Sequence, residues 1–362
     1  MQAVTVNVFP GGFNWGIYVA SRTGLFARNG IRVDLQETPN SVAQMTALAT
    51  GACDIAMTAV DNIVAYVEGR GEAPIGRQTE FFAFMGSDSG FLNLVAAPEV
   101  ASVAALKGRT VSVDAMTTGY AFVLFEMLRR NGLAPGDYAV ERVGGTAQRW
   151  QALRAGQQQA TLLSTPYNII AKAEGFLQLA RAVTLLGRYQ GNVGAARRSW
   201  ARQHQEIVVS YIRAYMAAIA WLYDRANRRD AVNILCETVP QMSGSLAEQT
   251  YDELLDPRDG FFRDGAIDAE GLRTVLDLRS RFANPAKPLN DPEKYVDDSY
   301  RRARRRNHRQ SASRLCDFKP METMARAGLG GQFVSGTPIQ GTAWLRARNP
   351  RHSASGGGPS IG

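Results

Sequence analysis

An internal repeat divides this sequence into two halves of similar plan. Arg28-Asn29-Gly30 closes one predicted helix and Arg130-Asn131-Gly132 closes another, and the same shift places Tyr18 on Tyr120. Each half follows the order strand, loop, helix three times over. Solenoids are built from several short repeats, whereas two copies of about a hundred residues predict two similar lobes. We therefore expect a cleft between the lobes and a functional site within it.

The net charge of +8 belongs to the C-terminal end of the chain and not to the predicted lobes. From Arg301 onward the sequence holds 12 basic and 2 acidic side chains, so the preceding residues are close to neutral. A nucleic-acid-binding surface needs a basic patch on the folded body. We therefore expect no nucleic-acid partner for the lobes. The chain as a whole is 45% hydrophobic, which is enough to fill substantial cores.

The three cysteines, Cys53, Cys236 and Cys316, show neither a CxxC pair nor ligand spacing. We interpret them as free thiols and expect no metal and no cofactor. No stretch reaches the ~18–20 uninterrupted apolar residues that span a bilayer. The chain also enters a predicted strand almost at once, without a basic and apolar leader. The protein is then either cytoplasmic, or has a leader that was trimmed or that precedes the assigned start.

Hydrophobic alternation and turn residues locate the strands and helices of both halves. Asn14, either Asn40 or Ser41, and Asp61 are predicted to cap helices, and beyond Gly194 we expect helices only. The predicted strands cover residues 4–8, 31–37, 54–59, 80–86, 91–97, 110–114, 138–143, 160–164 and 179–186. We expect the last of these strands to return to the first lobe.

These elements predict an α/β fold of two lobes followed by a C-terminal helical segment. Residues 1–88 and 186–304 are assigned to the first lobe, residues 89–185 to the second, and residues 305–362 to a disordered basic tail rich in Arg, Ser and Gly. The tail is either a basic arm for acidic lipids or nucleic acid, or the product of a reading frame lost near residue 305. We favour the second hypothesis.

The loops after the predicted strands carry the candidate site, because open α/β sheets bind ligands at the carboxyl edge of their strands. Small hydroxyls, amides and aromatic rings gather there, which is typical of a small-molecule pocket. At any single position an ordinary cap or turn residue is an equal interpretation, but the sets recur at matching places in both halves. The candidate residues are Phe13, Asn14, Trp15, Asn40, Ser41, Thr58, Asp61, Asn62, Met116, Thr117, Thr118, Tyr120, Thr146, Ser164 and Tyr167.

Three runs stand in order along residues 3–300: GIYVASRTGLFARNGIRVDL, MTALATGACDIAMTAVDN and LVAAPEVASVAALKGRTVSVD. In this order and spacing they resemble the solute-binding proteins of ABC importers in the nitrate, sulfonate, taurine and thiamine-precursor group. The resemblance implies a type II periplasmic-binding fold, in which each lobe is an open, mostly parallel sheet flanked by helices. Crossovers near residues 86–95 and 184–194 would then act as a hinge. It also implies a periplasmic monomer that meets the membrane only through a permease and its ATPase.

An enzyme is the alternative, since some relatives of this fold catalyse desulfination or thiamine-pyrimidine synthesis. His204 is the only histidine before the tail, whereas a nucleophile needs a base within hydrogen-bond reach and metal sites need several ligands. No cysteine cluster of the pyrimidine-synthase kind is present. A transcription regulator on this fold would need a helix-turn-helix before the first strand. We therefore expect binding and release without chemistry.

Two solute classes remain open. Helix N-termini in both lobes suit a small anion such as a sulfonate, nitrate or a carboxylate. Only one cleft loop has an arginine nearby, Arg149, whereas Asp61, Asp88 and Asp114 are all expected close by. Aromatic walls with carboxylates suit a neutral or weakly basic heteroaromatic compound such as a pyrimidine, and we favour this class slightly.

Overall fold

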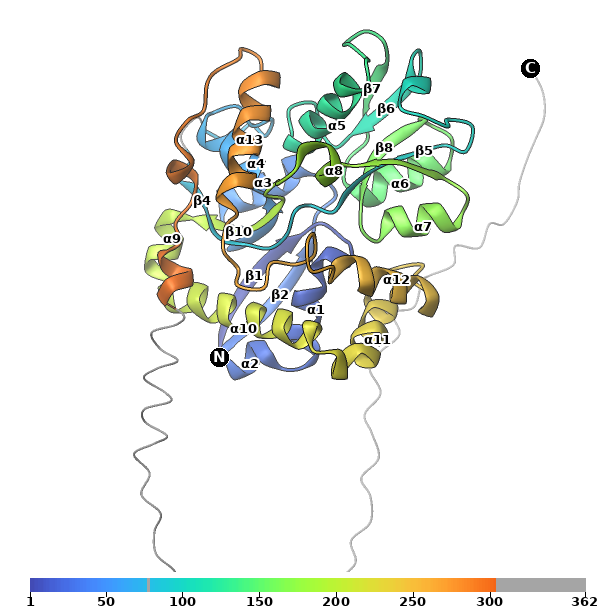
Figure 1. Cartoon of the computed structure of the whole chain (residues 1–362). Helices are drawn as coiled ribbons and strands as arrows, with labels where there is room; N and C mark the ends of the chain where they lie inside the picture. The colour runs from blue at the N-terminus through green and yellow to red at the C-terminus, as the bar shows by residue number, and fades with distance from the viewer. Residues whose placement is uncertain (77–78, 304–362) are drawn as a thin grey trace, which may run out of the picture. The chain divides into compact units, whose positions relative to one another are not determined.

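A computed structural model describes residues 1–76 and 79–303, which form two five-stranded sheets flanked by helices (Figure 1). The predicted tail, residues 305–362, and Cys316 lie outside the described residues. Each sheet has four strands that run in one direction and one reversed strand in the fourth position of the strand order. This arrangement confirms the predicted two-lobed α/β fold with mostly parallel sheets.

The first sheet has the order β2-β1-β3-β10-β4, with β1 paired in parallel to both β2 and β3 and β10 antiparallel to its two neighbours. Its strands are β1 (Gln2–Val8), β2 (Ile31–Glu37), β3 (Ile55–Ala59), β4 (Phe81–Gly86) and β10 (Asn192–Arg197). The helices between these strands are α1 (Trp15–Arg22), α2 (Leu25–Arg28), α3 (Ser41–Thr50) and α4 (Val60–Val67).

The second sheet repeats this plan in the order β7-β6-β8-β5-β9. Its strands are β5 (Leu92–Ala96), β6 (Thr110–Val113), β7 (Ala139–Arg142), β8 (Ala160–Ser164) and β9 (Leu177–Arg181). Its helices are α5 (Gly119–Arg130), α6 (Thr146–Arg154), α7 (Tyr167–Ala173) and α8 (Ala182–Leu186). β6, β7 and β8 therefore correspond to β1, β2 and β3.

The repeated helix ends have matching geometry. Asn29 donates its side-chain amide to the Leu25 carbonyl at 2.8 Å, and Asn131 donates to the Met127 carbonyl at the same distance. The following glycines adopt left-handed φ values of 77° and 83°, a conformation that costs little without a Cβ atom. The sequence repeat thus reports two copies of one structural unit.

The strand that returns to the first lobe is β10, and the sequence-based assignment of residues 179–186 to that role is wrong. Leu177–Arg181 forms β9 and pairs with β5 in the second sheet. β10 lies between β3 and β4, and Val193, Ala195 and Ala196 are fully buried. A strand buried on both faces shows no alternation of apolar and polar residues, which is why the sequence beyond Gly194 did not read as a strand.

Two crossovers connect the sheets, residues 87–91 between β4 and β5 and residues 187–191 before β10. Asp88 is fully buried at their junction, where its carboxylate accepts hydrogen bonds from the Gly90 amide at 2.7 Å and from the Asn192 side chain at 3.0 Å. A Cβ atom on Gly191 would lie 2.0 Å from the Gly90 nitrogen. The backbones of the two crossovers are therefore in direct contact.

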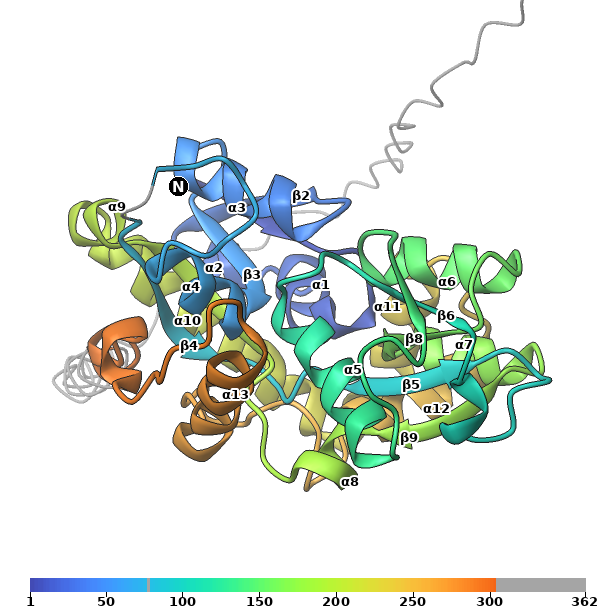
Figure 2. The same cartoon turned by 90° about the horizontal axis from the view of Figure 1, so that it is seen from above.

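The C-terminal part of the described chain is helical and packs on both lobes (Figures 1 and 2). Its helices are α9 (Arg198–Gln203), α10 (Gln205–Tyr223), α11 (Arg228–Thr238), α12 (Gly244–Leu254) and α13 (Ala269–Phe282). The expected stripe of Val208, Ile212 and Tyr215 on α10 is buried in the first-lobe core. No helix within residues 1–76 and 79–303 is long and apolar enough to cross a membrane.

The helix α13 lies between α4 of the first lobe and α5 of the second (Figure 2). Glu126 of α5 is fully buried and forms ion pairs with Arg129 and Arg130 of its own helix at 2.8 Å and with Arg281 of α13 at 3.1 Å. These guanidinium groups hold the pKa of Glu126 at about 2, below its ordinary value of 4.5. The charged form therefore stabilises the fold above pH 4.5, and this stabilisation is lost as the pH falls through about 2.

We expect Glu126→Gln to lower the free energy of unfolding by about 1–3 kcal/mol at pH 7, since the arginine partners are half exposed and screened by solvent. The difference from the unsubstituted protein should shrink as the pH falls below 4.5. Urea unfolding at pH 7 and pH 3 measures both effects, with exposed Glu270→Gln on α13 as the control. If the loss of unfolding free energy in Glu126→Gln were the same at both pH values, the ion pairs would not depend on the charge of Glu126, which would contradict this prediction.

Candidate functional site

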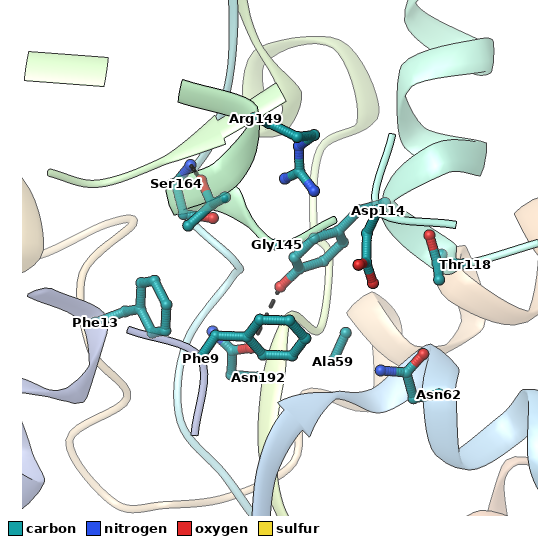
Figure 3. A pocket seen from close by; sticks show the side chains of 13 residues that line it. Phe9, Phe13, Ala59, Asn62, Asp114, Thr118, Gly145, Arg149, Ser164 and Asn192 are labelled. Carbon is teal, nitrogen blue, oxygen red and sulfur yellow. Dashed lines mark hydrogen bonds between the residues drawn. The ribbon is translucent and has the colours of Figure 1, made fainter. Parts of the chain in front are cut away.

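A cavity lies between the two sheets at the carboxyl edge of their parallel strands (Figure 3). It has a volume of about 50 Å³, well below the roughly 300–1,000 Å³ of pockets for drug-sized ligands. In this conformation it suits a compact solute. Its lining residues are Phe9, Phe13, Ala59, Asn62, Asp114, Thr118, Gly119, Tyr120, Gly145, Thr146, Arg149, Ser164 and Asn192.

Six of the fifteen candidate residues line this cavity: Phe13, Asn62, Thr118, Tyr120, Thr146 and Ser164. They come from both lobes and lie at or after the ends of five different strands, β1, β3, β6, β7 and β8. Polar side chains at this edge form hydrogen bonds with other residues of the same edge. The Thr146 hydroxyl accepts a hydrogen bond from the Ser164 amide at 3.2 Å, and Asn62 donates to the Thr58 hydroxyl at 2.9 Å. These six candidates therefore lie together at one edge of the two sheets.

Three aromatic and amide candidates from these loops lie outside the cavity lining. Trp15 is fully buried and donates its indole N–H to the Ala231 carbonyl. Its ring packs against Tyr251 in a T-shaped arrangement, with 5.6 Å between the ring centroids. Tyr167 packs in the core of the second lobe. Asn14 does not cap its helix but donates to the Phe9 carbonyl at 2.6 Å. These side chains support the fold around the cavity.

Other candidates form contacts between the lobes at the rim of the cavity. Asn40 caps α3 as predicted, through the Ala43 amide at 2.8 Å. The Ser41 amide donates to Asp114 of the second lobe at 3.1 Å, and the Thr117 amide donates to Glu72 of the first lobe at 2.8 Å. Thr58 is fully buried, and Met116 is 38% exposed. The Ser41 and Thr117 contacts join the two lobes beside the cavity.

Asp61 is not a helix cap, which corrects the sequence-based prediction. Its carboxylate receives two hydrogen bonds from Arg279 of α13, Nε to Oδ1 at 2.6 Å and Nη2 to Oδ2 at 2.5 Å, and both side chains are 1% exposed. The same Nη2 donates to the Thr117 carbonyl of the second lobe at 2.6 Å. Arg279 therefore joins both lobes to α13, and Asp61 is occupied by this contact.

Arg149 and Asp114 line the cavity from the second lobe, and neither was among the fifteen candidates. Both had been noted only as charges near the cleft loops. Arg149 lies one turn into α6 with 3% of its surface exposed, and Asp114 directly follows β6 with 9% exposed. Burial lowers the pKa of Arg149, and the negative charge of Asp114 opposes this shift. A charged residue next to an apolar strand, as in Asp114, is the sequence signal that could have identified it.

Phe9, Ala59 and Asn192 also line the cavity without being among the candidates, because they lie at the ends of β1 and β3 and at the start of β10 and not in the predicted loops. Asn192 accepts a hydrogen bond from the Tyr120 hydroxyl at 3.4 Å, drawn in Figure 3, and donates to Asp88 at the junction of the crossovers. Burial raises the pKa of Tyr120 well above its ordinary value, so the hydroxyl remains a donor. These hydrogen bonds link the cavity to the junction of the two crossovers.

Gly119 forms part of the cavity wall where the lobes meet. A Cβ atom at this position would lie 2.4 Å from the Asp61 Cβ atom, too close for any side chain. We expect Gly119→Ala to destabilise the closed protein by about 1–3 kcal/mol, because the lobes must separate or Asp61 must shift. Thermal unfolding measures the change. Gly244→Ala is the matched control, since Gly244 also begins a helix but has no atom within 4 Å of its Cβ position. Equal melting temperatures for the two variants would contradict close contact here.

The chemistry available at the cavity is that of hydrogen bonding and charge. Within the described residues, no group of three or more His, Cys, Asp or Glu is arranged to hold a metal ion. The cavity lining contains no histidine or cysteine, and His204 stacks on Trp200 at 5.0 Å outside it. The cavity therefore offers a buried cation, a buried carboxylate and aromatic surface.

Sequence comparison assigns the chain to a known family. Residues 2–236 match the model of the NMT1-like family. The chain belongs to this family. No curated protein sequence matches this NMT1-like protein.

Solved structures share its fold at low sequence identity. The periplasmic nitrate-binding protein NrtA from Synechocystis PCC 6803 matches with a TM-score of 0.69 at 13% identity, over 87% of this chain and 91% of its own. A ligand-binding component of an ABC-type import system from Staphylococcus aureus, solved with zinc bound, matches with a TM-score of 0.67 at 13% identity, over 83% and 98%. The desulfurization enzyme DSZB matches with a TM-score of 0.58 at 14% identity, over 85% and 100%. These similarities establish the type II periplasmic-binding fold.

Proposed function

We propose that this NMT1-like protein is an extracytoplasmic solute-binding protein that delivers a small organic or anionic solute to the permease and ATPase subunits of an ABC importer. The observation that carries the proposal is the cavity, which takes its lining from both lobes and from Asn192, the first residue of β10 after the second crossover. A solute held there favours the closed form to the extent that it binds that form more tightly than the open one. The solved binding proteins of the same fold support this function.

The proposed solute contacts are the six candidate residues that line the cavity, together with Arg149 and Asp114. On this proposal Asn40, Ser41 and Thr117 act at the rim, where they contribute to closure. The protein works as a periplasmic monomer, needs no cofactor or nucleic acid, and meets the membrane only through the permease.

An enzyme on the same fold is the second candidate, and the match to DSZB is the observation that favours it. General base and nucleophilic catalysis most often use histidine or cysteine. Neither occurs in the described cavity lining, whose hydroxyl groups come from Thr118, Tyr120, Thr146 and Ser164. This composition supports binding and release without chemistry.

A thermal-shift screen tests the proposal against a panel of sulfonates, nitrate, carboxylates and pyrimidines. A compound at a hundredfold over its dissociation constant should stabilise the protein by about 2.7 kcal/mol. Mass spectrometry should recover that compound unaltered after incubation. Conversion of the compound would establish the enzyme alternative, and the absence of stabilisation by every class would count against the proposed function.

A further inference from the structure

The cavity wall contributed by the second lobe carries two opposite charges that are nearly buried. Arg149 and Asp114 are 3% and 9% exposed, and Figure 3 shows both side chains above the first-lobe residues Phe9 and Phe13. No salt bridge of 4 Å or less joins the two groups within the described chain. Each charge must therefore be satisfied in some other way.

Arg149 is held by backbone carbonyls and has donors left over. Its Nε and Nη2 donate to the Leu162 carbonyl at 3.3 and 3.0 Å, and its Nη1 donates to the Gly144 carbonyl at 2.7 Å. A guanidinium group carries five N–H donors, so two remain. Within residues 1–76 and 79–303 no carboxylate forms an ion pair with this cation. A buried cation fixed in place but lacking a counterion is well placed to receive an acidic group.

The helix ends beside Arg149 add to the positive potential. α5 and α6 both begin at the cavity. Their N-cap residues are Thr118 and Gly145, and in neither helix does a cap side chain accept a hydrogen bond from the first backbone amides. Free amides at a helix N-terminus stabilise negative charge. They act together with the buried guanidinium and not as a separate site.

Asp114 presents the opposite requirement. Its Oδ2 atom accepts a hydrogen bond from the Ser41 amide at 3.1 Å. Its Oδ1 atom is buried and has no hydrogen-bond partner in the described chain. An unsatisfied buried acceptor costs free energy that a donor from a ligand would recover. A ligand N–H group, from an amine or an amino substituent, would satisfy Oδ1 by donating a hydrogen bond to it.

We propose that the solute is amphoteric, with an acidic group bound by Arg149 and an N–H donor group bound by Asp114. This inference rests on the proposed function and specifies the solute. The body between the two groups is compact and apolar, because the cavity is small and is bordered by Phe9 and Phe13. A purely acidic solute would leave Asp114 Oδ1 unpaired next to a second negative charge, and a purely basic solute would leave Arg149 without a counterion.

The test uses two matched series of compounds with the full-length chain. The aliphatic series is 3-aminopropanoate, propanoate and propylamine, and the aromatic series is 4-aminobenzoate, benzoate and aniline. Titration calorimetry at pH 7 compares their dissociation constants. In at least one series the amphoteric compound should bind about tenfold or more tightly than both of its relatives, since one charge-assisted hydrogen bond is gained at each end.

Asp114→Asn provides the second arm, because asparagine can still accept the Ser41 hydrogen bond but removes the negative charge. We expect the preference for the amphoteric compound over the acid to fall by about tenfold while binding of the acid persists. Glu99→Gln, which removes an exposed charge outside the cavity, should leave the preference unchanged.

Three results would overturn the inference: equal binding of the amphoteric compound and the acid, an unchanged preference in Asp114→Asn, or no binding in either series. Tight binding of the acid alone with closure of the lobes would overturn it and leave the proposed function standing. Failure of these compounds and of every class in the thermal-shift panel would overturn both.

Discussion

Replacing Arg279 with leucine is expected to lower the free energy of unfolding by about 3–5 kcal/mol, the usual cost of removing one partner from a buried ion pair. Asp61 would remain buried at 1% exposure without its cation, and the Thr117 carbonyl would lose its donor. Because Arg279 connects α13 to both lobes, the loss should appear as a large fall in melting temperature. Chemical unfolding at pH 7 measures it.

The double variant Asp61→Leu with Arg279→Leu distinguishes two causes of the lost stability, an unpaired buried charge and the loss of packing around Arg279. Replacing both partners of a buried ion pair by apolar groups is often close to neutral, so the double variant should recover much of the lost stability. Exposed Arg273→Leu on the same helix is the control. A single variant as stable as the unsubstituted protein would show that the ion pair does not hold the lobes to α13.

Replacing Arg149 with methionine should weaken binding of any acidic compound identified in the screen by about a hundredfold, or roughly 2.7 kcal/mol. The guanidinium is the buried cation of the cavity and has two N–H groups free for a ligand. The variant also loses its bonds to the Gly144 and Leu162 carbonyls, so its melting temperature will fall. Binding is therefore measured by calorimetry well below that temperature.

Arg154→Met is the matched control for Arg149→Met. Arg154 lies on the same helix, but its side chain is 48% exposed and pairs with Glu174 outside the cavity. It should keep full affinity. Equal affinity in the two variants would place the acid-binding site elsewhere in the protein.

Most of the fold could be predicted from the sequence, because its signals are local. Apolar alternation located β1 and β2, and the paired Asn-Gly helix ends marked the two copies of the unit. Which sheet β9 and β10 join depends on pairing between strands that are distant in the sequence. Val193, Ala195 and Ala196 of β10 are buried on both faces of the sheet, which removes the alternation that sequence analysis relies on.

The loops that line the cavity could be predicted from the sequence, but which of their residues face it could not. Trp15 and Phe13 are neighbours in one predicted loop, yet Phe13 lines the cavity and Trp15 is buried against Tyr251. The direction of each ring depends on how α1 packs against helices more than two hundred residues later in the chain. Asp61 likewise could not be assigned without knowing where Arg279 lies. Tertiary packing, and not loop position, decides which side chain faces the cavity.

Small-angle X-ray scattering of the full-length chain, with and without a saturating compound from the screen, tests most directly whether this protein is a clamp that closes on its solute. The account predicts a smaller radius of gyration with the compound bound, because closure brings the two lobes together around the cavity. The same radius with and without a compound that raises the melting temperature would contradict it.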